Sequence, residues 1–146
     1  MNEVVSKWLE RAKEDLQLVE NEIKMDEPLY NTISFHIQQF VEKYLKAFLI
    51  DKGILPERTH NIDFLLFKCK NIDSDFEEFF ESSIVDLTEC AVSIRYPDND
   101  IYIDKDFVEE MLGLAYKLKG LIESKLGFNS QPETETDTDE ESGQAS

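Results

Sequence analysis

The amino-acid sequence predicts an all-α protein, built as an antiparallel up-and-down four-helix bundle with one extra short helix. Apolar residues recur every three or four positions in five segments, and no segment shows the sustained alternation that is typical of a strand. Short breaks containing Pro, Gly or Asn separate the segments. We therefore expect one helical domain over residues 1–127 and a disordered acidic tail over residues 128–146.

The first two segments predict two long helices. In the first, apolar residues recur from Val5 to Ile23 with charged residues on the opposite face, and Pro28 marks the break that follows. The second covers about residues 31–52 and carries two adjacent rows of apolar side chains, so we expect it to be the most buried helix. Gly53 suits the position after this helix, where a left-handed residue commonly closes the last turn.

The third and fourth segments predict a short helix and a longer one. Thr59 or Asn61 can cap the short helix. Ser74 and Glu77 have the spacing of a capping box and predict the start of the fourth helix, which we expect to continue to the break at Pro97. Its expected core face comprises Phe76, Phe80, Ile84, Leu87, Ala91 and Ile94.

The last helix is expected to begin near Asp104 and to end at Gly127. Helices of about 20 residues joined by short connections pack as antiparallel neighbours, so the four longer helices would form the bundle and the short one a cross-piece. We expect Lys43 and Lys46, on the second helix, to lie on a solvated face with local charge pairing.

The charge of the chain limits its partners. The tail holds six of the 32 acidic residues and none of the 15 basic ones, so residues 1–127 keep a net charge of −11 out of −17. Such a balance repels phosphate backbones, which disfavours RNA as a ligand. The acidic surface and tail suit either a basic protein partner or exclusion from nucleic acid, and the tail on its own is more often a solubilising extension than a specific binder. Residues 131–146 contain no large apolar side chain, and we expect them to be disordered.

Several classes of protein are not supported by the sequence. The longest uncharged stretch, residues 28–41, is too short and too polar to span a bilayer, and the start has no signal-peptide pattern, so we expect a cytoplasmic protein without a membrane role. Cys69 and Cys90 form no CxxC pattern, and we expect both to be reduced core residues. Neither a metal site nor a cofactor is predicted.

A combination of motifs resembles the HEPN family of helical-bundle domains. It comprises the stretch 35–47 of the second helix, Thr59-His60 after Gly53, and the stretch 94–98, Ile-Arg-Tyr-Pro-Asp. The resemblance covers roughly residues 31–126 and implies an up-and-down bundle that forms a homodimer. It also implies a minimal nucleotidyltransferase (MNT) as the protein partner, because many members pair with one in toxin–antitoxin systems. Active members cleave RNA without a metal.

The family's catalytic pattern is an Arg followed, after four to six residues, by a His, and MNT-paired members often read R-x4-H-x-Y. The matching positions here are Arg95, Asp100 and Tyr102, so Asp replaces the motif His. A carboxyl with an ordinary pKa of about 3.9 is a weak base and a poor acid at neutral pH. The resemblance therefore implies a degenerate metal-independent endoribonuclease, with Arg95 and Asp100 as its catalytic candidates.

The resemblance gives Tyr102 a second role, because the MNT protein of such pairs silences its HEPN partner by adenylylating the motif Tyr. Possible supporting residues are His36, Glu42, Tyr96 and Asn99. Purely structural roles stay open: Tyr102 would pack on its loop, Arg95 would interact with the end of its helix, His36 would be partly buried and His60 would cap or pack at a helix start. The alternative function is a non-catalytic nucleotide-binding or protein-interaction module.

Overall fold

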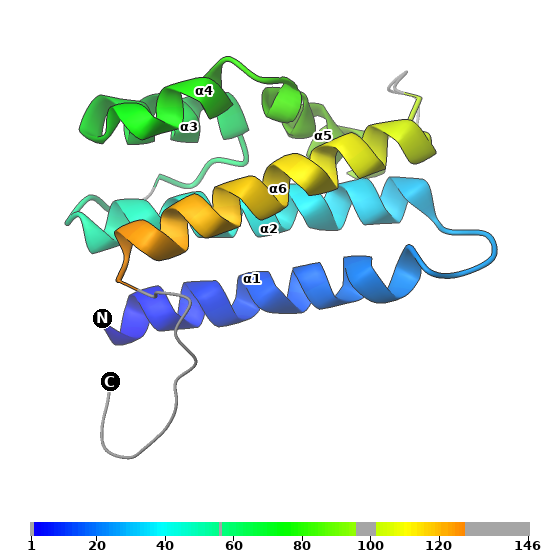
Figure 1. The fold of residues 1–146 in the computed structure, drawn as a ribbon, viewed down its shortest axis with the longest axis horizontal. Coiled ribbons are helices and arrows are strands. Elements are labelled where there is room, and N and C mark those ends of the chain that lie inside the picture. Colours follow the sequence, from blue (N-terminus) through cyan, green and yellow to red (C-terminus); the bar gives the residue numbers. More distant parts are fainter. Residues whose placement is uncertain (1, 56, 96–101, 128–146) are drawn as a thin grey trace.

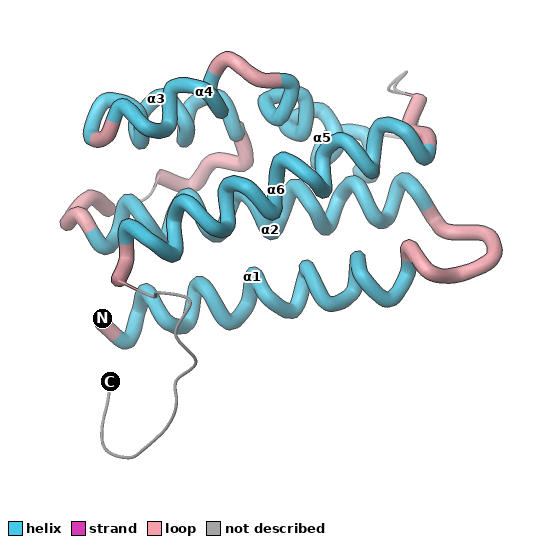
Figure 2. Tube along the Cα trace, in the orientation of Figure 1, coloured by secondary structure: helices cyan, strands magenta, loops and turns pink. Residues whose placement is uncertain are grey.

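The protein is described by a computed structural model for residues 2–55, 57–95 and 102–127. All regular structure in these residues is helical, which confirms the predicted fold class (Figure 2). The predicted acidic tail and three motif positions, Tyr96, Asn99 and Asp100, lie outside the described residues. The helices are α1 (Glu3–Glu22), α2 (Tyr30–Asp51), α3 (Ile62–Ile72), α4 (Glu77–Phe80), α5 (Leu87–Arg95) and α6 (Lys105–Lys125), with short 3₁₀ turns at Ser74–Phe76 and Ser83–Asp86.

Helix α2 lies at the centre of the molecule. Helix α1 packs along it on one side, and α3, α5 and α6 pack on it from other directions (Figure 1). Most of the side chains on α2 are buried, including the aromatic rings of Phe40, Tyr44 and Phe48. The prediction that this helix is the most buried is therefore confirmed, and its wide apolar face allows neighbours to surround it.

The helix ends follow the local signals in the sequence. The side chain of Asn61 caps α3 by accepting a hydrogen bond from Phe64 N at 2.8 Å, and Asp104 caps α6 by accepting one from Phe107 N at 2.9 Å. Gly53 and Gly127 follow α2 and α6 with positive φ angles of 81° and 83°. A left-handed residue at this position closes the helix, and glycine adopts it without a steric penalty.

The prediction of one continuous fourth helix is wrong. The segment is divided by a turn at Ser82, whose hydroxyl donates to the carbonyl of Phe79 at 2.8 Å and accepts from Ile84 N at 3.1 Å. These side-chain bonds replace helical backbone bonds, which is how Ser competes with helix formation. Phe79, 3% exposed, is buried in the core, while Phe80 is only partly buried.

The predicted capping box at Ser74 and Glu77 is also wrong. The carboxylate of Asp73 accepts a hydrogen bond from Asp75 N at 3.0 Å, so the residue before Ser74 caps the segment. A 3₁₀ turn then precedes α4. Asp and Ser are both effective caps, and their order in the sequence does not decide which of them takes the position.

Cys69 and Cys90 are buried and unpaired, as the sequence predicted for core residues. Burial raises the pKa of the Cys90 thiol to about 11 and raises that of Cys69 as well, so both are poor nucleophiles at neutral pH. Among the described residues, no helix combines the length and apolar character needed to cross a bilayer. In the same part of the chain, no group of three or more His, Cys, Asp or Glu residues is placed to hold a metal ion.

Candidate functional site

The motif turn joins α5 to α6. Arg95 is the last residue of α5, and Tyr102 lies two residues before the Asp104 cap of α6. The structure therefore places both ends of the motif, while Asp100 between them is outside the described residues. The start of α6 lies at the end of the bundle opposite to the start of α1 (Figure 1).

Tyr102 is 84% exposed, so its ring as well as its hydroxyl is largely in water. The backbone beyond it is fixed, because Ile103 is 8% exposed in the core and Asp104 caps the next helix. An exposed aromatic ring next to a fixed backbone is accessible to a second macromolecule.

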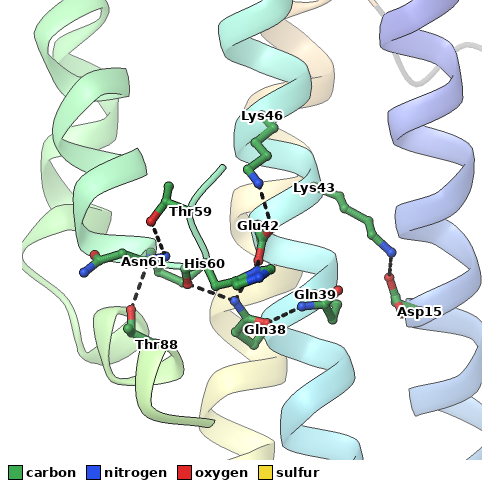
Figure 3. A network of polar contacts seen from close by, with 11 residues as sticks. Asp15, Gln38, Gln39, Glu42, Lys43, Lys46, Thr59, His60, Asn61 and Thr88 are labelled. Carbon is green, nitrogen blue, oxygen red and sulfur yellow. Dashed lines mark hydrogen bonds and ion pairs between the residues drawn. The ribbon is translucent and has the colours of Figure 1, made fainter. Parts of the chain in front are cut away.

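A second group of polar side chains is centred on Glu42 of α2, which is 5% exposed (Figure 3). Its carboxylate accepts hydrogen bonds from Lys46 Nζ at 2.8 Å and Gln38 Nε2 at 3.0 Å. Nδ1 of His60 lies 2.9 Å from Glu42 Oε1. Gln38 Nε2 also donates to the carbonyl of His60 at 3.1 Å, so α2 holds both the ring and the backbone of this histidine. We call Gln38, Glu42, Lys46 and His60 the Glu42 cluster.

The hydrogen bonds of the Glu42 cluster keep its carboxylate ionised. Burial raises the pKa of Glu42, but the hydrogen bonds from Lys46, His60 and Gln38 and the charge of Lys46 outweigh burial, so the pKa is lowered from 4.5. Lys46, 6% exposed, is itself buried, which corrects the prediction that it lies on a solvated face. The loop that returns over α2 after Gly53 covers this side of the helix, and the indole ring of Trp8 lies 5.7 Å from Lys46 Nζ.

The loop carrying His60 is held on both sides. Thr59 Oγ1 accepts from Asn61 N at 3.1 Å, and Thr88 Oγ1 of α5 accepts from Ile62 N at 2.9 Å (Figure 3). His60 comes directly before Asn61, which caps α3, and its ring bonds to Glu42 instead of capping the helix.

His36 belongs to a separate ion-pair group that joins α1 to α2. Its Nδ1 lies 2.8 Å from Asp15 Oδ1, and Lys43 Nζ lies 2.7 Å from Asp15 Oδ2. His36 is only partly exposed, in agreement with its structural interpretation. The structure thus brings Glu42 together with His60, and places His36 in another group.

The Glu42 cluster lies near the start of α5, the helix that ends at Arg95. Thr88, which contacts the loop beside His60, is near the start of α5, and Arg95 is seven residues further along the helix. Seven residues correspond to about 10 Å at 1.5 Å per residue. A histidine oriented by a carboxylate is a common arrangement for a general base.

Glu42 was predicted from the sequence as a supporting residue, but its contacts with the other members of the Glu42 cluster were not. The available signal was the row of polar residues Gln38, Glu42 and Lys46, spaced four apart within an otherwise apolar helix. Residues at this spacing are neighbours on a helix surface. His60 is 18 residues from Glu42 in the sequence, and only the loop path brings it there.

Comparison with known proteins identifies the family of the chain. The family model described as HEPN domain matches residues 5–125. This range leaves out the first two residues of α1 and includes all the other helices in full. Neither curated proteins nor solved structures give a significant match. Because the family model covers most of the sequence and the fold is helical as the resemblance implied, the chain belongs to the HEPN domain family.

Proposed function

We propose that this protein is the HEPN component of a toxin–antitoxin-type pair with an MNT protein, and that Tyr102 is its site of adenylylation. The observation that carries the proposal is the 84% exposure of Tyr102 at the Tyr position of the R-x4-D-x-Y motif. Membership of the HEPN family supports it, because the motif is then compared within the correct family.

The modification requires an accessible phenol. The Tyr102 oxygen attacks the α-phosphorus of ATP, the bond between the α- and β-phosphates breaks, and pyrophosphate leaves. The phenolic proton passes to a base on the partner enzyme. A largely exposed side chain can enter the partner's active site without unfolding the bundle, whereas the fully buried phenol of Tyr44 cannot.

Ribonuclease activity is expected to be weak. RNA cleavage without a metal needs a base, an acid and a cation for the charge on phosphorus. Arg95 would supply the cation, and Asp100 replaces the better acid–base group His. A substitution Arg95→Ala should reduce any cleavage of RNA by the purified chain to background, measured with a fluorogenic RNA substrate. Strong cleavage that survives this substitution would remove Arg95 from the site.

The working form is proposed to be a homodimer. Large apolar side chains are exposed at the α1–α2 connection and on α3, where Met25, Leu29, Phe67 and Ile72 are each more than 40% exposed. Exposed apolar side chains of this size are a common feature of subunit interfaces. Light scattering coupled to size-exclusion chromatography should give twice the 17.0 kDa mass of the chain.

The adenylylation proposal is tested by co-expressing the chain with the MNT protein encoded by the neighbouring reading frame. Intact-mass and peptide mass spectrometry should find an adenylyl adduct on wild-type Tyr102 and none after Tyr102→Phe. Tyr116→Phe is the matched control, because Tyr116 is also exposed but its hydroxyl donates to Glu20, and this variant should keep the adduct.

Two outcomes would contradict the proposal. An adduct confined to another residue would remove Tyr102 as the acceptor. Tight nucleotide binding by the chain alone, with no adduct in the presence of the partner and no effect on growth, would instead support a non-catalytic nucleotide-binding module.

A further inference from the structure

A surface pocket lies between the N-terminal half of α1 and the middle of α2. Its volume is about 320 Å³, and it is lined by Val4, Lys7, Trp8, Arg11 and Lys43. Four of these residues come from α1. Lys7 and Trp8 lie three and four residues after Val4, and Arg11 lies four and three residues after them, so the side chains are neighbours on the helix surface. We call this site the Trp8 pocket.

The Trp8 pocket gathers positive charge on a chain with a net charge of −17. Lys43 is paired with Asp15, but within the described residues neither Lys7 nor Arg11 forms an ion pair. Two exposed cations beside an indole ring and the apolar side chain of Val4 are suited to an anionic segment that also offers nonpolar contact.

The acidic tail has the complementary composition. Residues 133–141 contain six carboxylates and no base, in the order Glu-Thr-Glu-Thr-Asp-Thr-Asp-Glu-Glu. An extended chain carries every second side chain on one face, about 6.6 Å apart. Lys7 and Arg11 are four residues apart on a helix, which corresponds to about 6 Å along its axis. Alternate carboxylates of an extended segment would therefore match the spacing of these two cations.

The starting point of the tail is close enough for this contact. The hydroxyl of Tyr44 donates to Glu123 in the last turn of α6, and Lys46, two residues further along α2, lies over the ring of Trp8. The end of α6 and the pocket are thus level with each other along α2, and Figure 1 shows the end of α6 on the same side of the molecule as the start of α1. Glu133 is eight positions after Lys125, a distance along the chain that can span about 26 Å when extended.

We infer that residues 133–141 of the tail dock in the Trp8 pocket of their own chain, where their carboxylates pair with Lys7 and Arg11. Docking neutralises these cations and covers the pocket, so phosphate-bearing ligands are excluded from it. The tail then competes with other anions for binding to the Trp8 pocket. This inference does not depend on the proposed adenylylation of Tyr102.

Zero-length carbodiimide cross-linking of the full chain tests the contact directly. At low salt, peptide mass spectrometry should find amide bonds joining Lys7 to carboxylates within residues 133–141. The ion pair between Lys125 Nζ and Asp73 Oδ2 at 2.9 Å is an internal control that should cross-link regardless of the tail. A mixture of ¹⁴N- and ¹⁵N-labelled chains separates contacts within one chain from contacts between chains, and cross-links found only between chains would overturn the inference.

Trp8 provides a second test, because it is the single tryptophan of the chain. Iodide should quench its fluorescence more strongly, by at least about twofold, when the tail is neutralised by E133Q, E135Q, D137N and D139N, since iodide is drawn to the freed cations. The difference should vanish near 1 M salt, where the screening length is about 3 Å. Adding K7Q and R11Q to the tail variant should remove the increase.

The matched control changes four exposed carboxylates elsewhere, by D26N, E27Q, E77Q and E81Q, and alters the net charge equally. It should leave iodide quenching unchanged. Equal quenching in the wild type and the tail variant would overturn the inference. The inference would also be overturned if ATP protected Trp8 from iodide quenching equally in the wild type and in the tail variant. The pocket would then accept a phosphate-bearing ligand whether or not the tail is charged.

Discussion

At the scale of single residues, Glu42 illustrates how a buried charge is maintained. Transfer of a carboxylate away from water is costly, and here three hydrogen-bond partners, one of them the buried cation Lys46, compensate for it. Lys46 depends on Glu42 in turn, because this lysine is 6% exposed and has its ion pair there. The Glu42 cluster also connects α2 to the loop before α3, so one carboxylate contributes to both packing and loop position.

Replacing Glu42 by Gln should therefore lower the free energy of unfolding by about 3–5 kcal/mol, the range for removing one partner of a buried ion pair. Urea denaturation at neutral pH measures this change. The double replacement Glu42→Leu with Lys46→Met should cost less than Glu42→Gln alone, because it leaves no buried charge unpaired. An equal or larger cost for the double variant would show that the packing of these side chains, rather than their charge, controls stability.

The pH dependence of stability follows from the lowered pKa of Glu42. A carboxyl whose pKa is lower in the folded chain than its ordinary value of 4.5 stabilises the fold above pH 4.5, and this contribution is lost as the pH falls through the folded pKa. The difference in melting temperature between the wild type and Glu42→Gln should thus shrink on acidification from about pH 6 to pH 3. A difference that stays constant over this range would exclude ionised Glu42 as its source.

At the scale of elements, helix ends are determined by local chemistry. Gly53 after α2 has a φ angle of 81°, a conformation that costs a residue with a Cβ about 1–2 kcal/mol. Gly113 lies inside α6, and a Cβ added there would meet no atom within 4 Å. Replacement of the two glycines by alanine should therefore have opposite effects on stability.

Gly53→Ala should destabilise the protein by about 1–2 kcal/mol, while Gly113→Ala should stabilise it by about 0.5–1 kcal/mol through helix propensity. Thermal unfolding of the two variants, followed by circular dichroism at 222 nm, compares the same chemical change in two backbone conformations. A loss of stability in Gly113→Ala would mean that α6 contacts another subunit at this position.

At the scale of the whole molecule, the charge of −17 opposes compaction, because like charges repel across the surface. Raising the ionic strength from about 0.01 to 0.15 M shortens the screening length from about 30 to 8 Å. The melting temperature should rise over this range, since the exposed ion pairs that salt weakens contribute little. Differential scanning calorimetry measures the shift.

The tail-neutralised variant carries four fewer carboxylates, a net charge of −13 instead of −17, and should show a smaller salt effect. A larger salt effect in this variant would contradict self-repulsion as the cause. The wild type and the tail-neutralised variant are also the two proteins compared in the quenching experiment. The effect of net charge on stability and the docking of the tail can therefore be measured on the same samples.

The sequence by itself determined the helical class, the burial of the second helix, the start of α6 near Asp104 and the glycines that end α2 and α6, and it narrowed the cap of α3 to Thr59 or Asn61. These features depend on residues within one or two turns of each other, so spacing and residue type are sufficient. The motif ends at Arg95 and Tyr102 were also found from spacing, which specifies positions along the chain but not side-chain exposure.

Only the tertiary structure decided that the fourth segment is divided at Ser82 and that Lys46 and His60 meet at Glu42. The division at Ser82 accompanies the burial of Phe79 in the core, a contact that local apolar spacing does not encode. The contact of His60 with Glu42 depends on a loop that returns across α2 and brings together residues 18 positions apart. Burial is a property of the packed chain, because the neighbours that exclude water come from other elements.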